Sequence, residues 1–262
     1  MKNETTWVLG PCSIENRETY FQVSDELSRV MSGRDWFLKA SFDKANRTSL
    51  HGGRGPGLDE SLEIFKEVKQ RHPGVKLCSD VHEVWQVEKL AGVIDCIQIP
   101  AFLCRQTDLI VECAKHFDVI NIKKGQWLGP NNLVISVDKV RETNENAEVW
   151  LTERGTMHGY HKLLVDFDIV DRLQEHYDKV VIDCTHSTQR SRDVYGMQGR
   201  GDLAERFLLG ADVFRYNAIF AECHPNPTSA VSDGDCQIDL SRIETLVQTH
   251  DKIKAALEGV WE

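Results

Sequence analysis

The chain lacks several features that would assign it to a whole class of proteins. Its 41 acidic and 31 basic residues give a formal net charge of −10, which argues against a general nucleic-acid footprint. No apolar run approaches the roughly 20 residues of a membrane span. Residues 1–6 lead into a short apolar stretch without the longer apolar core of a secretory signal. We therefore expect a cytoplasmic protein that binds neither nucleic acid nor membrane.

The chain also lacks a disulfide framework. Its eight cysteines stand at irregular spacings with no CxxC pair, so we expect reduced thiols, of which one or two at most take part in chemistry. In so acidic a chain, an anionic substrate would have to be held by a local cluster of basic side chains.

Short apolar runs alternate with segments of helical periodicity along the chain. In one such segment Leu58, Leu62, Phe65 and Val68 recur at helical spacing. Apolar strands that alternate with amphipathic helices indicate a parallel sheet covered on both faces. Eight such units favour a closed (β/α)8 TIM barrel over an open sheet, with residues 1–262 as one catalytic domain. The expected strands contain Trp7–Leu9, Trp36–Leu38, Val75–Cys78, Cys96–Ile99, Val119–Ile122, Val149–Leu151, Val180–Ile182 and Ala218–Phe220.

Two segments show no such pattern. Residues 188–212 are rich in Arg, Gly and Asp, and we expect a mobile loop there. The glycine-rich residues 51–57 lack the Lys-Ser/Thr ending of a P-loop and the spacing of a dinucleotide fingerprint, so we expect a flexible turn.

Polar side chains follow every expected strand. Because the active site of a parallel barrel forms at the carboxyl ends of its strands, these side chains should converge on one mouth. Arg47 and Arg105 lie further along their loops, where they could hold a second phosphate or be solvated surface residues. The basic residues expected to form a pocket for phosphate and carboxylate groups are Lys39, Lys44, Lys123 and Arg154.

One thiol, one imidazole and two carboxyl groups fall at the same expected end of the barrel. They belong to Cys12, His186, Glu222 and Asp233, a ligand set suited to a divalent transition metal such as Mn, Fe, Co or Zn. Outside a barrel, Cys12 would more often be a buried apolar thiol and His186 a hydrogen-bonded core residue. Their shared end of the barrel favours the metal site.

The sequence resembles the family of 3-deoxy-D-manno-octulosonate 8-phosphate synthases over most of its length. The resemblance implies a transferase that condenses phosphoenolpyruvate with arabinose 5-phosphate on the route to lipopolysaccharide, and it implies a homotetramer. The motifs that carry it are GPCSIE at 10–15, SFDKANRTS at 41–49, RGPGL at 54–58 and QIPAFLCRQTD at 98–108, with further matches at 121–126, 151–155, 185–187 and 222–225.

The resemblance also implies roles for individual residues. Asn46, Arg47 and Thr48 would hold the aldose phosphate, and Arg105 would reach the site of a neighbouring subunit. Family members with Cys at the position of Cys12 need a metal, whereas those with Asn there do not. The residues that would line the phosphoenolpyruvate pocket are Lys39, Ser41, Lys44, Asp80, Gln98, Lys123 and Arg154.

The expected reaction joins carbon 3 of phosphoenolpyruvate to the aldehyde carbon. Water adds at carbon 2 and phosphate leaves by C–O cleavage, while basic side chains stabilise the developing charge and the metal orients the aldehyde or the water. The residues expected to be catalytic are Lys44, Lys123, His186 and Asp233.

Other interpretations stay open. The heptulosonate phosphate synthases share the GPC start and the barrel, but they usually carry KPRT where this chain has KANRT at 44–48, so Asn46 favours the longer aldose. Residues 189–217 match the family least, which leaves the exact aldose open. A metal-dependent hydrolase would act without phosphoenolpyruvate, and a non-catalytic sugar-phosphate sensor would bind ligands without releasing phosphate.

Overall fold

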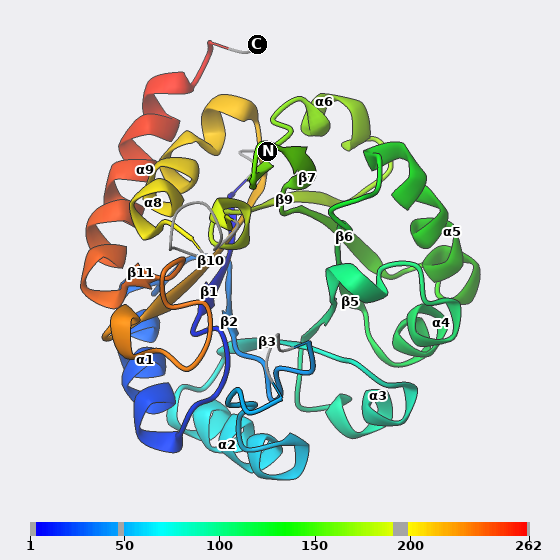
Figure 1. Ribbon diagram of the computed structural model, residues 1–262, viewed down its shortest axis with the longest axis vertical. Helices are drawn as coiled ribbons and strands as arrows, with labels where there is room; N and C mark the ends of the chain where they lie inside the picture. Colours follow the sequence, from blue (N-terminus) through cyan, green and yellow to red (C-terminus); the bar gives the residue numbers. More distant parts are fainter. Residues whose placement is uncertain (1–3, 47–49, 191–198, 261–262) are drawn as a thin grey trace.

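Eight parallel strands close into a barrel with the helices around its outside (Figure 1). This computed structural model describes residues 4–46, 50–190 and 199–260. The first strand pairs with the last in parallel register, with Gly10 opposite Glu222, and this pairing closes the sheet. The (β/α)8 prediction is confirmed, and each expected run lies in or overlaps one barrel strand. In order around the barrel these are β1 (Thr6–Gly10), β2 (Trp36–Lys39), β3 (Lys76–Asp80), β4 (Cys96–Ile99), β5 (Val119–Lys123), β6 (Glu148–Glu153), β9 (Lys179–Asp183) and β10 (Ala218–His224).

The sequences of the first two helices explain where they begin and which faces they bury, and α2 contains the segment of helical spacing expected from Leu58 to Val68. Helix α1 (Arg17–Val30) begins after Asn16, whose side chain accepts a hydrogen bond from the backbone N–H of Thr19 at 2.8 Å. Helix α2 (Leu58–Arg71) has acidic residues in its first turn and basic residues in its last, which suits the helix dipole. The other α-helices are α3 (Val84–Leu90), α4 (Thr107–His116), α5 (Val134–Thr143), α6 (Ile169–Leu173), α8 (Gly201–Gly210) and α9 (Ile243–Leu257). Short 3-10 helices lie at η1 (Ala101–Leu103), η2 (Pro130–Leu133), η3 (His186–Thr188), η4 (Asp212–Phe214), η5 (Pro227–Ser229) and η6 (Leu240–Arg242).

The expectation of a loop over residues 188–212 is wrong for much of that segment. Helix α8 occupies Gly201–Gly210 and packs against α9, with Ala204 and Leu208 buried four residues apart on one face. Leu203, Ala204, Phe207 and Leu208 stand at helical spacing in the sequence, but the Arg-, Gly- and Asp-rich residues before them led to the expectation of a loop. Residues 191–198 of the expected loop lie outside the described residues.

Two small strand pairs were not expected. A hairpin of β7 (Thr156–Gly159) and β8 (Lys162–Leu164) follows β6, and Tyr160 and His161 form its turn with positive φ angles of 28° and 64°. Strand β11 (Ile238–Asp239) pairs with the end of β10. Both pairs lie on loops that follow the carboxyl ends of barrel strands, so they shape the mouth of the barrel.

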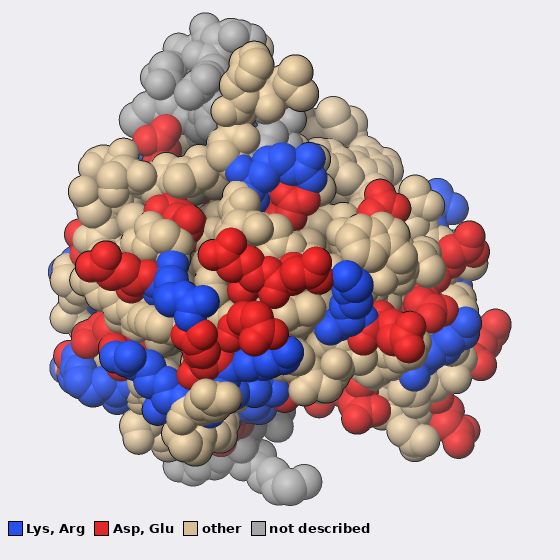
Figure 2. All heavy atoms as spheres, turned by 90° about the horizontal axis from the view of Figure 1, so that it is seen from below, with Lys and Arg blue, Asp and Glu red and all other residues tan. Residues whose placement is uncertain are grey.

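The surface carries both signs of charge. Figure 2 shows acidic and basic side chains interspersed over the face that it presents. Exposed ion pairs, such as Arg71 with Asp25 at 2.5 Å, also occur in the structure. None of the helices that the structure describes has the length and apolarity needed to cross a bilayer. All eight cysteines are buried, and no disulfide is formed within the described chain.

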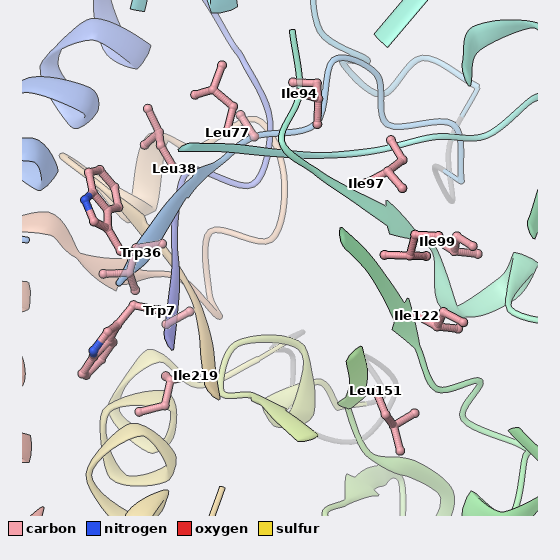
Figure 3. Packing of buried hydrophobic residues seen from close by; sticks show 14 of the residues in the cluster. Trp7, Trp36, Leu38, Leu77, Ile94, Ile97, Ile99, Ile122, Leu151 and Ile219 are labelled. Atoms are coloured by element: carbon pink, nitrogen blue, oxygen red, sulfur yellow. The ribbon is translucent and has the colours of Figure 1, made fainter. Parts of the chain in front are cut away.

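The core has two layers because strand side chains alternate between the two faces of the sheet. The outer layer, between strands and helices, includes Trp7, Leu38 and Ile97 (Figure 3). The inner layer fills the barrel and includes the edge-to-face pair Phe37 and Trp150, whose ring centroids are 5.3 Å apart. The other residues of the inner layer are Val8, Cys78, Cys96, Val181, Ala218 and Phe220. This packing makes the barrel interior solid and leaves the strand ends to carry the site.

Candidate active site

The carboxyl ends of the strands surround two adjoining cavities. The larger has a volume of about 630 Å³, and its lining includes Asn46, Gln189 and Asp233. The smaller, of about 260 Å³, reaches down to Lys39, Ser41, Asp80, Gln98 and Lys123. Both cavities are lined by Lys44, Asn46, Arg154 and His186, among others. The shared lining indicates one continuous site at the mouth of the barrel.

Three potential metal ligands meet on one side of this mouth. Ligand atoms of Cys12, Glu222 and Asp233 lie within 4.8 Å of one another, and the Cys12 thiol donates to Asp233 Oδ2 at 3.2 Å. Glu222 Oε2 is buried and accepts no hydrogen bond from the residues that the structure describes. A buried carboxylate oxygen without a donor, beside a thiol and a second carboxylate, fits a divalent cation. We call these three residues the metal group.

His186 lies beside the metal group rather than within it. Its Nε2 is 3.7 Å from Glu222 Oε1, and its Nδ1 contacts Asp183 Oδ2 at 2.8 Å. Asp183 also accepts the backbone N–H groups of Thr185 at 3.1 Å and His186 at 2.8 Å. The ring is therefore held from its Nδ1 side, which is how carboxylates commonly orient metal-binding imidazoles.

The ionisation of the metal group depends on its surroundings. Burial raises the pKa of the Cys12 thiol, and the nearby Glu222 raises it further. Burial alone would raise the pKa of Glu222, but the charges of His186, Lys39 and Lys44 lower it. The site therefore holds an ionised carboxylate next to a protonated thiol. A metal ligand must be a thiolate, so a bound cation would have to displace the thiol proton.

Two buried lysines line the smaller cavity. Lys39 is 2 % exposed and donates hydrogen bonds to the carbonyl of Cys12 at 2.8 Å and to Glu222 Oε1 at 3.1 Å. Burial would lower the pKa of Lys39, but Glu222 raises it. Lys123 pairs with Asp183, and its ammonium lies 3.3 Å from the centre of the Phe220 ring. Burial lowers the pKa of Lys123, although Asp183 opposes the shift.

A third cation, Arg154, immediately follows β6 and lines both cavities. Arg154 is 6 % exposed and donates from Nη2 to Gln189 Oε1 at 3.0 Å. Its Nη1 is buried without a hydrogen-bond acceptor among the described residues. Burial lowers the pKa of Arg154, but a guanidinium stays charged in proteins. A buried donor without an acceptor fits an anionic ligand.

The structure brings most of the expected site residues together. Lys39, Ser41, Lys44, Asn46, Asp80, Gln98, Lys123, Arg154, His186 and Asp233 line the two cavities. Cys12 and Glu222 lie in the metal group. Arg105 follows η1, is exposed and is not part of the described cavity lining. Arg47 and Thr48 lie outside the described residues.

Three further residues of the site had no predicted role. Asp183 ends β9, where the rule of polar strand ends could have identified it. His82 follows β3 and contacts Asp80 Oδ2 through Nε2 at 2.9 Å, so the same rule applies. Gln189 is neutral and lies six residues beyond the end of β9. The rule that charged and polar residues at strand ends form the site would therefore not identify it.

Comparison with known proteins agrees with the geometry. A model of the DAHP synthetase I family matches residues 2–258. The 2-dehydro-3-deoxyphosphooctonate aldolase of Wolinella succinogenes is 41% identical over 256 residues, which cover 92% of this chain and 95% of the relative. The protein of the same name from Fusobacterium nucleatum is 37% identical over 268 residues, covering 99% and 94%. That of Helicobacter pylori is 38% identical over 262 residues, covering 94% of each.

Proposed function

The chain belongs to the DAHP synthetase I family, and from this premise we propose that it condenses phosphoenolpyruvate with D-arabinose 5-phosphate. The products are 3-deoxy-D-manno-octulosonate 8-phosphate and inorganic phosphate, and the chain is an enzyme of lipopolysaccharide synthesis. The shared name of the relatives, 2-dehydro-3-deoxyphosphooctonate aldolase, supports this product.

One observation carries the proposal: three buried cations and a metal group share a single barrel mouth. Phosphoenolpyruvate carries a phosphate and a carboxylate, and it needs cationic partners at both ends. Lys39 ends β2, Lys123 ends β5 and Arg154 immediately follows β6, so the cations come from three different parts of the barrel. The metal group and Lys44 lie at the same mouth, where the aldehyde end of an aldose phosphate would be placed.

The proposed reaction begins with carbon 3 of phosphoenolpyruvate forming a bond to the aldehyde carbon. Water adds to carbon 2, and the bond between carbon 2 and the phosphate oxygen then breaks to release phosphate. Lys39, Lys123 and Arg154 hold the two anionic groups and stabilise the charge that moves onto phosphate. Lys44, 3.7 Å from Asp233 Oδ2, is placed to donate toward the aldehyde oxygen.

Cys12, Glu222 and Asp233 would hold a divalent metal, with His186 as a fourth ligand, and the cation would polarise the aldehyde or orient the water. We assign the chain to the metal-dependent group on this basis, with Mn, Fe, Co or Zn as the candidate ions. His186 and Asp233 would also be catalytic, because as ligands they would position the cation that orients the reacting water.

The remaining assignments belong to the same proposal. Asn46, with Arg47 and Thr48, would bind the aldose phosphate, and Arg105 would reach a neighbouring subunit within a homotetramer. We place the enzyme in the cytoplasm, with residues 1–262 as a single catalytic domain.

Phosphate release tests substrate and metal together. The enzyme is incubated with phosphoenolpyruvate and either arabinose 5-phosphate, erythrose 4-phosphate or ribose 5-phosphate, each with chelator and after addition of Mn, Co or Zn. Release with arabinose 5-phosphate that chelator abolishes supports the proposal. Preference for erythrose 4-phosphate would indicate a heptulosonate phosphate synthase, and no release with any aldose would favour the sensor.

A further inference from the structure

We propose that Gln189 is a positioning residue that couples Arg154 to Asp233, and so joins the anion-binding and metal-binding halves of the site. The inference rests on the proposed function. Gln189 Oε1 accepts a hydrogen bond from Arg154 Nη2 at 3.0 Å, and Gln189 Nε2 donates one to Asp233 Oδ1 at 3.1 Å. One side chain thus spans the two halves.

The two partners fix the orientation of the amide. A guanidinium can only donate hydrogen bonds, and an ionised carboxylate can only accept them. Asp233 already acts as an acceptor here, because its Oδ2 accepts hydrogen bonds from the Cys12 thiol and the Ser232 hydroxyl. A neutral amide is the side chain that accepts from one partner and donates to the other. A glutamate could accept from Arg154 but could not donate to Asp233.

The amide contacts one atom of each partner and leaves the second atom of each facing the site. Asp233 Oδ2 accepts hydrogen bonds from the Cys12 thiol at 3.2 Å and from the Ser232 hydroxyl at 2.8 Å, and Arg154 Nη1 is buried without an acceptor in the described chain. Gln189 holds the remaining atom of each side chain. Gln189 therefore fixes Arg154 Nη2 and Asp233 Oδ1. Arg154 Nη1 could then bind substrate, and Asp233 Oδ2 could bind a metal.

The backbone of Asp233 is in an uncommon conformation. Its φ angle is 52°, in the left-handed region that residues other than glycine seldom adopt. The backbone of Gln189, in contrast, is anchored without its side chain: its N–H donates to the carbonyl of His186 at 3.1 Å, and its carbonyl accepts from the N–H of Leu163 at 3.2 Å. A change of the amide alone should therefore leave the local fold intact.

The test compares Gln189→Met, which has similar length but neither hydrogen bond, with the wild type and with Gln174→Met, an exposed control on the surface. Equilibrium dialysis with Co(II) in the absence of substrate measures metal affinity, and steady-state kinetics at saturating Co(II) give KM for phosphoenolpyruvate and kcat. For Gln189→Met we expect the Co(II) dissociation constant and the KM each to rise about tenfold. The kcat should change by less than about threefold, because no reacting atom is touched.

A second variant tests the polarity. Gln189→Glu places a carboxylate against Asp233 and neutralises Arg154, so KM for phosphoenolpyruvate should rise further than in Gln189→Met. Thermal unfolding within 2 °C or so of the wild type would show that each variant is folded.

The coupling would be overturned if Gln189→Met kept the wild-type Co(II) dissociation constant and the wild-type KM for phosphoenolpyruvate, or if only one of the two rose. If the wild type released no phosphate, the proposed function would fail, but dialysis would still decide whether Gln189 supports the metal group.

Discussion

The carboxylate of Glu15 accepts a hydrogen bond from the backbone N–H of Val231 at 2.6 Å, across 216 positions of the sequence. Its second oxygen lies 3.4 Å from His224 Nε2. Glu15 follows β1 on the loop that carries Cys12, and Val231 lies two residues before Asp233. This single side chain therefore links the loops that carry two members of the metal group.

Loss of the Glu15 carboxylate should loosen the metal group. We expect Glu15→Ala to weaken Co(II) binding about tenfold, because the segment before Asp233 loses its anchor. Glu15→Gln keeps an oxygen acceptor for Val231 and should stay within about threefold of the wild type. Equilibrium dialysis measures the Co(II) dissociation constants of both variants. Equal effects of the two substitutions would refute the anchoring role.

Removal of the Cys12 thiol should abolish metal-dependent activity. Cys12→Ala takes away the one sulfur ligand of the metal group, so we expect bound metal to fall below the wild-type content and phosphate release to fall at least 100-fold. Metal analysis of the purified protein and the phosphate assay check this. Cys113→Ala, at a buried thiol of α4, is the control. Full activity of Cys12→Ala in chelator would eliminate the metal role.

Arg154 should not be replaceable by lysine. The guanidinium donates from Nη2 to Gln189 and has a buried Nη1 for a ligand, and an ammonium group cannot reproduce this planar pair of donors. We expect Arg154→Lys to raise KM for phosphoenolpyruvate about 10- to 100-fold. Initial rates over a range of substrate concentrations test this, with the exposed Arg172→Lys as control. An unchanged KM would remove Arg154 from the substrate site.

Stability should depend on pH through Asp35, which immediately precedes β2 at the opposite end of the barrel. Burial alone would raise the pKa of Asp35, but hydrogen bonds from Lys76 and Thr6 and the charge of Lys179 lower it. A carboxyl whose pKa is lowered by folding stabilises the protein above its unfolded pKa of about 4, and this contribution is lost as pH falls through the folded value.

The measurement is urea unfolding of the wild type and Asp35→Asn from pH 7 to pH 3. The wild type should be more stable by about 1 kcal/mol at pH 7, and the difference should shrink below about pH 4. Asp168→Asn, at a surface carboxyl that is 74% exposed, is the matched control. A difference that stays constant with pH would exclude an electrostatic role for Asp35.

The barrel strands were predictable because their residues are buried on both faces. Runs such as Val180–Ile182 are therefore continuously apolar, and the rule that strand ends form the site then places Cys12, Lys39 and Glu222 together. The β7–β8 hairpin escaped prediction because it is largely exposed, with Tyr160 at 88%. Its strands consequently show no apolar run.

The supporting contacts of the site could not be predicted from local pattern. Asp233 lies nine residues beyond β10, and it was assigned to the metal site from the barrel model rather than from a motif directly at a strand end. Glu15 and Gln189 act through partners 216 and 44 positions away. Their importance comes from which loops meet at the mouth, and this is decided by closure of the barrel.

The pairing of β1 with β10 also determines when the site can exist during synthesis. Cys12 and Asp233 are 221 positions apart, so a nascent chain that has not yet delivered its last barrel strand carries only part of the metal group. A divalent cation would therefore find its complete set of ligands only after the barrel has closed. The Cys12 thiol is synthesised near the beginning of translation, whereas Glu222 and Asp233, the carboxyl groups that lie beside it in the folded barrel, are synthesised near the end.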